Sequence, residues 1–175
     1  MKTTEHGTRN TLLLRNRQRT RPVDLRFLRR LTGALLESHL RLSAYELGIH
    51  LVGAQEMAVL NETFLGHPGS TDVITFDHAE PAANDRHAAP LHGELFICVD
   101  DAVAQARQFR TSWPAEVVRY VVHGVLHLRG FDDLRPAARR KMKREETRLV
   151  RVLAGEFSFA RLERPARANA NPAAK

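Results

Sequence analysis

The stretch WPAEVVRYVVHGVLHLRG, residues 113–130, decides how the chain is organised. Ser112, Pro114 and Glu116 mark the start of a helix, because serine caps a first turn and proline fits its first positions. Gly130 marks the end, because glycine adopts the left-handed conformation that terminates many helices. Apolar residues lie on most sides of this helix, which is typical of a helix buried nearly all round. They are Val117, Val118, Val121, Val122, Val125 and Leu128.

Two histidines and an aspartate follow a spacing that suits a metal ion. His123 and His127 are four residues apart and therefore share one face of the helix. The turn at Gly130 then brings Asp133 back across that face as a third ligand. Three protein ligands leave one tetrahedral position for water, as in catalytic zinc sites. The alternative is a pair of hydrogen-bonded core histidines, but the added glycine and aspartate favour one Zn²⁺ ion or another divalent metal.

Asp132, beside the third proposed ligand, has two interpretations. It could orient a ligand histidine or relay a proton, which would make it a catalytic residue. It could equally stabilise the turn that follows the helix. The sequence leaves both interpretations open.

The same spacing is similar to the zinc-protease pattern His-Glu-x-x-His-x-x-Gly-x-x-(His or Asp). In this chain Gly124 occupies the position of the catalytic glutamate. Peptide hydrolysis needs that glutamate to move a proton from water to the leaving amine. A small metalloprotease is therefore the weaker interpretation, and it would need a glutamate from elsewhere, with Glu94 the first candidate.

The remaining pattern predicts one α+β domain, a small mixed sheet of about four strands packed with about five helices, with the metal site on the buried helix. We expect residues 10–160 to form this domain and residues 1–9 and 161–175 to be disordered tails, because both ends lack bulky apolar groups. Strands are expected near 12–14, 45–52, 72–76 and 94–99, and helices near 24–36, 54–66, 100–110, 113–130 and 136–153.

The chain is basic and rich in arginine. A formal net charge of +7 includes 27 basic residues, of which 23 are arginines. The planar guanidinium binds phosphate bidentately, so this composition suits a polyanionic partner such as RNA. A genome whose base composition favours arginine codons explains the ratio equally well, so charge alone supports RNA only weakly.

Nothing in the sequence predicts export or membrane association. Cys98 is the single cysteine, so no internal disulfide can form. The chain has neither a signal-peptide pattern nor an apolar stretch of the roughly 18 residues that a membrane span needs. We therefore expect a cytoplasmic protein.

These motifs resemble the YbeY family of bacterial metal-dependent, single-strand-specific endoribonucleases. The family signature is similar to His-Gly-x-Leu-His-Leu-x-Gly-Tyr-Asp-His, and residues 123–133 read HGVLHLRGFDD. Two further segments resemble the family in the same order, MAVLNETFLGHPGSTDVITF at 57–76 and GELFIC at 93–98. The resemblance covers about residues 10–155. It implies a zinc-dependent nuclease that acts on single-stranded RNA, on ribosomal RNA of the small subunit in 16S 3′-end maturation and in ribosome quality control, without DNA specificity.

Two positions depart from the family pattern. Asp133 stands where the family has a third ligand histidine, and its negative charge should make a bound water less acidic. Leu65 stands in the loop where the family commonly has an arginine regarded as important for activity, and leucine cannot contact a phosphate. Arg119, on the ligand face, and Arg129, beside His127, are our catalytic candidates to replace that contact.

Asp72 and Thr75 lie on the strand that resembles the family's Thr-Asp-Val motif. They could line the cleft or belong to plain sheet surface, and the pattern slightly favours surface.

An endoribonuclease is the leading interpretation, because RNA cleavage does not require a glutamate at position 124. The ribose 2′-hydroxyl or an activated water can attack the phosphodiester. The alternative is a ribosome-associated RNA-binding factor that cleaves poorly. The departures at Leu65 and Asp133 favour this alternative, because both could reduce activity.

Overall fold

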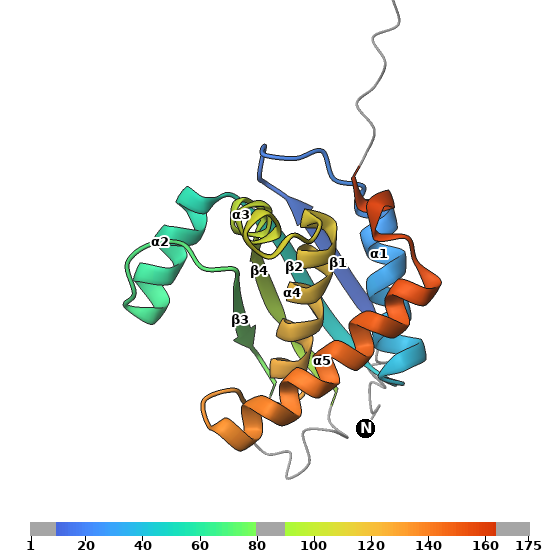
Figure 1. The fold of residues 1–175 in the computed structure, drawn as a ribbon. Coiled ribbons are helices and arrows are strands. Elements are labelled where there is room, and N and C mark those ends of the chain that lie inside the picture. Colours follow the sequence, from blue (N-terminus) through green and yellow to red (C-terminus); the bar gives the residue numbers. More distant parts are fainter. Residues whose placement is uncertain (1–9, 80–89, 164–175) are drawn as a thin grey trace, which may run out of the picture.

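The computed structural model describes residues 10–79 and 90–163. Within them, four strands form one mixed sheet in the order β1-β2-β4-β3 (Figure 1). β1, β2 and β4 run parallel, and β3 is an antiparallel edge strand beside β4. The predicted four-stranded mixed sheet is confirmed. The strands are β1 (Thr11–Asn16), β2 (Tyr45–Val52), β3 (Val73–Asp77) and β4 (Leu91–Cys98).

Five α-helices accompany this sheet in the described residues, so the predicted α+β fold is also confirmed. Two shorter helical segments were not predicted, a π-helical continuation of the first helix and a 3₁₀ turn after the last. The helices are α1 (Leu25–Gly33), η1 (Ala34–His39), α2 (Ala54–Leu65), α3 (Val99–Phe109), α4 (Trp113–Leu128), α5 (Pro136–Glu156) and η2 (Phe159–Leu162).

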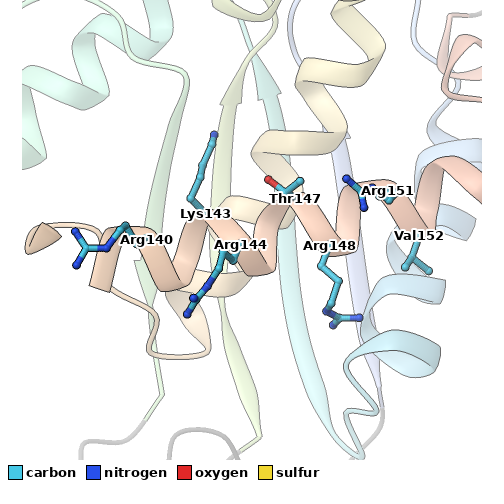
Figure 2. A pocket seen from close by; sticks show the side chains of 7 residues that line it. All are labelled: Arg140, Lys143, Arg144, Thr147, Arg148, Arg151 and Val152. Atoms are coloured by element: carbon cyan, nitrogen blue, oxygen red, sulfur yellow. The ribbon is translucent and has the colours of Figure 1, made fainter. Parts of the chain in front are cut away.

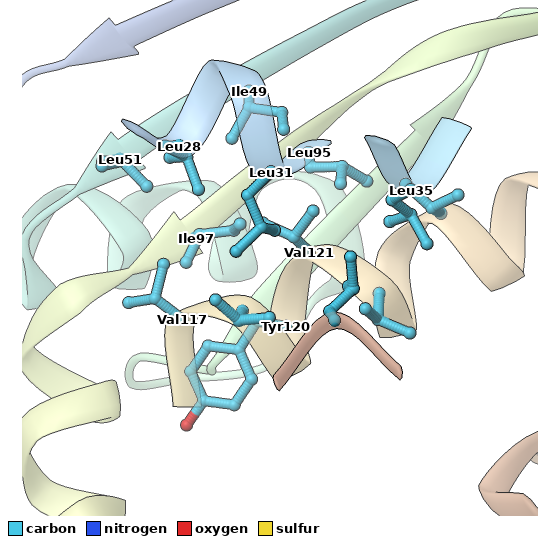
Figure 3. Close-up of a cluster of buried hydrophobic side chains, with 14 of the residues drawn as sticks. Leu28, Leu31, Leu35, Ile49, Leu51, Leu95, Ile97, Val117, Tyr120 and Val121 are labelled. Carbon is cyan, nitrogen blue, oxygen red and sulfur yellow. The ribbon is translucent and has the colours of Figure 1, made fainter. Parts of the chain in front are cut away.

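The main core lies between the sheet and the helices α1, α4 and α5, which cover the same face (Figures 1 and 3). Successive side chains of a strand point to opposite faces, so alternate residues of β2 and β4 enter this core. Burying such aliphatic side chains stabilises the fold by roughly 1.5–3 kcal/mol each. Labelled examples are Ile49, Leu51, Leu95 and Ile97 from the sheet, Leu28 and Leu31 from α1, and Val117 and Val121 from α4.

Helix α4 lies directly on β4 because two glycines remove the side chains that would separate them. A Cβ on Gly124 would lie 2.6 Å from Cδ2 of Leu95, and a Cβ on Gly93 would lie 2.6 Å from Cδ2 of Leu128. Both distances are shorter than real contacts allow. The close approach sets the depth at which the last turns of α4 sit against the sheet.

The expected end of the domain at residue 160 was wrong. Leu162 is fully buried, and its carbonyl accepts a hydrogen bond of 2.9 Å from the backbone N–H of Asp24. Glu163 also forms a bridge with Val23. One leucine in a run rich in arginine and proline gave too weak a signal for this packing. The remaining residues of the expected tails, 1–9 and 164–175, lie outside the described residues.

Across the described parts of the chain, no helix combines the length and the apolar character needed to cross a membrane.

Candidate metal centre

The end of α4 forms a glycine-terminated turn that reverses the chain. Gly130 has φ +82° and its N–H donates to the carbonyl of His127 at 2.8 Å. The N–H of Phe131 donates to the carbonyl of Leu126 at 3.0 Å. This pair of bonds is the Schellman arrangement, in which glycine takes the left-handed position. The predicted turn is confirmed, and it carries Asp133 back toward α4.

His123, His127 and Asp133 come together as predicted. The two Nε2 atoms are 3.1 Å apart, and Oδ2 of Asp133 lies 3.8 Å from Nε2 of His123 and 3.9 Å from Nε2 of His127. All three side chains are half-buried. Arg139 fixes the backbone of Asp133, because its Nε donates to the Asp133 carbonyl at 2.8 Å.

The spacing of these donor atoms fits a divalent metal ion. Zinc bonds of about 2.0–2.1 Å at a tetrahedral angle place two ligand atoms about 3.4 Å apart. The distances of 3.1, 3.8 and 3.9 Å lie on both sides of that value. Two imidazoles and one carboxylate are a common zinc donor set. Within the described residues, this is the one group of three or more acidic, histidine or cysteine side chains with such convergence.

Glu146 of α5 holds His123 from the side opposite the cluster. Its Oε2 lies 3.0 Å from Nδ1 of His123, while its Oε1 accepts hydrogen bonds from Arg119 Nη1 and Lys143 Nζ, both at 3.0 Å. A carboxylate that accepts the Nδ1 proton leaves the Nε2 lone pair free for a metal. Glu146 therefore selects the tautomer of His123 that suits a ligand.

The charge states of Glu146 and His127 also suit a metal site. Burial alone would raise the pKa of the Glu146 carboxyl, but hydrogen bonds from His123, Lys143 and Arg119 lower it to about 2. Burial and, secondly, the neighbouring His123 lower the pKa of His127. At neutral pH Glu146 is thus an ionised acceptor and His127 a neutral imidazole, which is the form that binds metals.

A hollow of about 540 Å³ opens beside the cluster, and His123, His127 and Asp133 form one side of it. Thr75 of the edge strand β3 and Asp72, which precedes that strand, also line the hollow, so the slight preference for plain sheet surface was wrong. Leu65, at the end of α2, is 51% exposed and also lines the hollow. The position that departs from the family pattern therefore faces the cluster.

A protease would need a glutamate that faces the cluster, and none of three positions, 124, 94 and 146, provides one. Gly124 packs against Leu95, so its position points to the sheet. Glu94 projects from the other face of β4, where its carboxylate contacts His50 at 3.0 Å and His78 at 3.3 Å. Glu146 is behind His123 and contacts Nδ1 rather than the Nε2 side. The geometry therefore gives the protease interpretation no glutamate base at position 124, 94 or 146.

The three residues predicted to be catalytic make other contacts, and none of them is among the residues that line the hollow. Arg119 is held between Glu146 and Glu116, at 3.0 and 3.5 Å. Arg129 caps α4 and is 8% exposed. Oδ1 of Asp132 accepts a hydrogen bond of 3.0 Å from the backbone N–H of Leu134, which is the turn-stabilising contact. Their catalytic roles remain predictions.

Sequence reasoning missed Glu146. Its signal was present, because Met142, Glu146, Leu149 and Leu153 follow helical spacing and are all buried. A carboxylate on the apolar stripe of an otherwise basic helix needs buried partners. The sequence could therefore have indicated Glu146 as a buried carboxylate with a specific partner.

The model of the family described as Endoribonuclease YbeY matches residues 13–154, which is more than half of the chain. The chain belongs to the YbeY endoribonuclease family. The resemblance drawn from the motifs at 57–76, 93–98 and 123–133 is confirmed.

Curated YbeY proteins match over about 60% of this chain. An Endoribonuclease YbeY from Anaeromyxobacter sp. (strain Fw109-5) is 41% identical over 107 residues, which are 61% of this chain and 54% of the relative. One from Chlorobium phaeovibrioides is 33% identical over 106 residues, which are 61% of this chain and 67% of the relative. The chain thus spans between half and two thirds of the length of these YbeY relatives.

A solved structure shares the fold. The solution structure of TM1509 from Thermotoga maritima has a TM-score of 0.60 and 23% sequence identity, and the match covers 83% of this chain and 91% of that chain. This likeness supports the architecture of the YbeY-family domain.

Proposed function

We propose that this protein is a metal-dependent endoribonuclease that cleaves single-stranded RNA, with His123, His127 and Asp133 as the ligands of one Zn²⁺ ion. The observation that carries the proposal is the convergence of these three side chains, within 4.8 Å of one another, at the side of an open hollow. Membership of the YbeY endoribonuclease family supports the same reaction class.

The residues around the cluster have distinct roles in this proposal. A bound divalent ion would supply a Lewis acid for the phosphodiester and would make a water more acidic. Glu146 orients His123, and Arg139 anchors the backbone of Asp133. Arg119 and Arg129 stabilise negative charge on the phosphate, and Asp132 moves a proton at the edge of the site.

The biological setting of the proposal is ribosomal RNA. We assign to the protein a cytoplasmic role in maturation of the 16S 3′ end and in ribosome quality control, with the small ribosomal subunit as partner. Its support is family membership together with the basic composition of the chain, whose net charge is +7.

A second candidate is a ribosome-associated RNA-binding factor that cleaves poorly. Leu65 favours it, because this exposed side chain faces the cluster and can make no charged contact with a phosphate. Binding to ribosomal subunits that survives His127→Ala, in a protein without nuclease activity, would support this candidate over the enzyme.

The proposal is tested by incubating the purified protein with labelled single-stranded RNA, with Zn²⁺ and with excess chelator. Cleavage should depend on the metal and should fall at least about 100-fold in His123→Ala. His92→Ala is the control, because His92 is an exposed histidine of β4 that does not belong to the cluster. Cleavage that is indifferent to both chelator and His123→Ala would overturn the proposal.

A further inference from the structure

Helix α5 carries a strongly basic outer surface. Between Pro136 and Glu156 it has seven basic and three acidic residues, a surplus of four positive charges out of the chain's net +7. Met142, Leu149 and Leu153 are buried on its inner side. The basic side chains are consequently left on the side that faces solvent.

Five of these basic residues surround one hollow of about 550 Å³ (Figure 2). Together with Thr147 they form what we call the α5 basic face: Arg140, Lys143, Arg144, Arg148 and Arg151. A helix rises about 1.5 Å per residue, so the face extends about 17 Å along α5. That length suits several consecutive charges of a linear polyanion.

The positive charges of this face are poorly compensated within the protein. Arg148 pairs with Glu145 at 2.6 Å, but the arginine is 52% exposed, and such surface pairs contribute little. Arg140, Arg144 and Arg151 have no acidic partner among residues 10–79 and 90–163. Because like charges four residues apart destabilise a helix, the row Arg140, Arg144 and Arg148 opposes folding of α5. An anionic partner would offset that repulsion.

One end of the α5 basic face lies near the cluster of His123, His127 and Asp133. Lys143, which lines its hollow, donates to Oε1 of Glu146 at 3.0 Å, and the same Glu146 holds His123. Arg139, one residue before the face, donates to the carbonyl of Asp133. One end of the α5 basic face therefore lies next to residues that contact His123 through Glu146 and Asp133 directly.

We propose that the α5 basic face binds the phosphate backbone of single-stranded RNA on one side of the bond that is cleaved at the cluster. This inference rests on the proposed function and adds to it a second, extended contact with the substrate. Arginine matches phosphate with a planar pair of N–H donors, and charge contacts of this kind bind RNA without sequence preference.

A membrane surface fits the α5 basic face less well. Helices that lie on lipid combine basic residues with bulky apolar side chains that enter the bilayer. The bulky apolar residues of α5 are turned into the core, and Val152 is the apolar residue that lines the hollow. The exposed side thus offers charge without an inserting surface.

Binding of labelled RNA to the full, zinc-loaded chain tests the inference. Oligonucleotides of about four and about 16 nucleotides carry 2′-O-methyl groups to resist cleavage, and their integrity is checked on a gel. The variant Arg144→Gln, Arg148→Gln, Arg151→Gln removes three charges and keeps good helix formers. The control variant Arg19→Gln, Arg26→Gln, Arg107→Gln removes three exposed charges outside α5. Circular dichroism verifies that both fold.

We expect the α5 variant to bind the long RNA at least about tenfold more weakly and the short RNA equally well. Each lost phosphate contact lowers the slope of log K against log salt by about 0.7, so the slope should fall by about 2. The control variant should change affinity less than about twofold. Equal losses in both variants would overturn the inference, as would an unchanged salt slope in the α5 variant.

Polyglutamate and phosphatidylserine vesicles serve as competing polyanions. If the α5 variant loses affinity for these polyanions as strongly as it loses affinity for RNA, the face is a general anion surface and the inference fails. Failure of the proposed function is distinguishable, because it would be seen as metal-independent or absent cleavage while RNA binding still depended on α5. If cleavage of long RNA needs the metal but is equally fast in both variants, the α5 inference fails and the proposed function stands.

Discussion

Nδ1 of His123 on α4 lies 3.0 Å from Oε2 of Glu146, which is 23 residues later on α5. One proposed metal ligand therefore takes its orientation from a different helix. The carboxylate is 3% exposed and is held in turn by Arg119 and Lys143. The cluster depends on how α5 packs across α4 as much as on the ligands themselves.

Glu146→Gln should weaken Zn²⁺ binding about 10- to 100-fold, because partners of ligand histidines typically contribute that much to metal affinity. The amide keeps the size of the side chain but no longer fixes the His123 tautomer. Competition with a chromogenic chelator measures the affinity. Glu145→Gln is the matched control, since Glu145 pairs with Arg148 and does not contact His123. Equal zinc affinities of Glu146→Gln and wild type would contradict the role of Glu146.

The free energy of unfolding should depend on pH through Glu146. Its folded-state pKa is about 2, below the ordinary value of 4.5, so ionised Glu146 stabilises the native state at every pH above 4.5. The contribution, on the order of 3 kcal/mol, is lost as pH falls from 4.5 toward 2. Urea unfolding of wild type and Glu146→Gln at stepped pH should show a gap that narrows below pH 4.5. A constant gap would argue against this linkage.

Asp133→His should shift metal preference toward zinc. An imidazole is a softer ligand than a carboxylate, so the ratio of Mn²⁺ to Zn²⁺ dissociation constants should rise at least about tenfold. Asp133→Ala should instead weaken binding of both metals. Titration calorimetry with each metal measures the ratio. If Asp133→Ala binds both metals as wild type does, Asp133 is not a ligand.

Leu65→Arg should raise affinity for single-stranded RNA about fivefold, because Leu65 faces the cluster and a charged hydrogen bond to phosphate contributes about 1 kcal/mol at an exposed site. Fluorescence anisotropy measures the change. Val59→Arg is the control, since Val59 is 60% exposed on the same helix and does not line the hollow. An equal gain from Val59→Arg would show that added charge, rather than position 65, is responsible.

Gly124→Ala should destabilise the fold by about 1–3 kcal/mol, because its Cβ would lie 2.6 Å from a fully buried Leu95 side chain. Gly155→Ala is the matched control in α5. Nothing lies within 4 Å of its added Cβ, so the change should stabilise the helix by up to about 1 kcal/mol. Chemical denaturation measures both changes, and a neutral Gly124→Ala would contradict the close packing of α4 on β4.

The His–His–Asp cluster could be predicted from sequence because its geometry is local. His123, His127 and Asp133 lie within one helix and the turn after it, and helical spacing with a glycine stop determines their relative positions. The buried character of α4 followed from its apolar pattern in the same way. Both features need no knowledge of distant contacts.

The residues that spacing could not place depend on packing between distant elements. Glu146 reaches His123 only because α5 crosses α4 at a particular register. Leu65 and Asp72 face the hollow because α2 and the edge strand are positioned by the sheet. Glu94 was considered as a base, but the alternation of β4 turns it to the other face, where it contacts His50. Sequence periodicity reports the faces of one helix or strand and does not show how distant elements pack together.

Gly124 limits which activities the candidate metal centre could acquire by substitution. A glutamate there would need the space of Leu95, and its carboxylate would enter a dry core without partners, which is costly. A peptidase could not arise on this scaffold by exchanging that one residue. Its base would have to come from another wall of the hollow, such as position 75 on β3, so repurposing the site depends on the sheet edge rather than on the ligand helix.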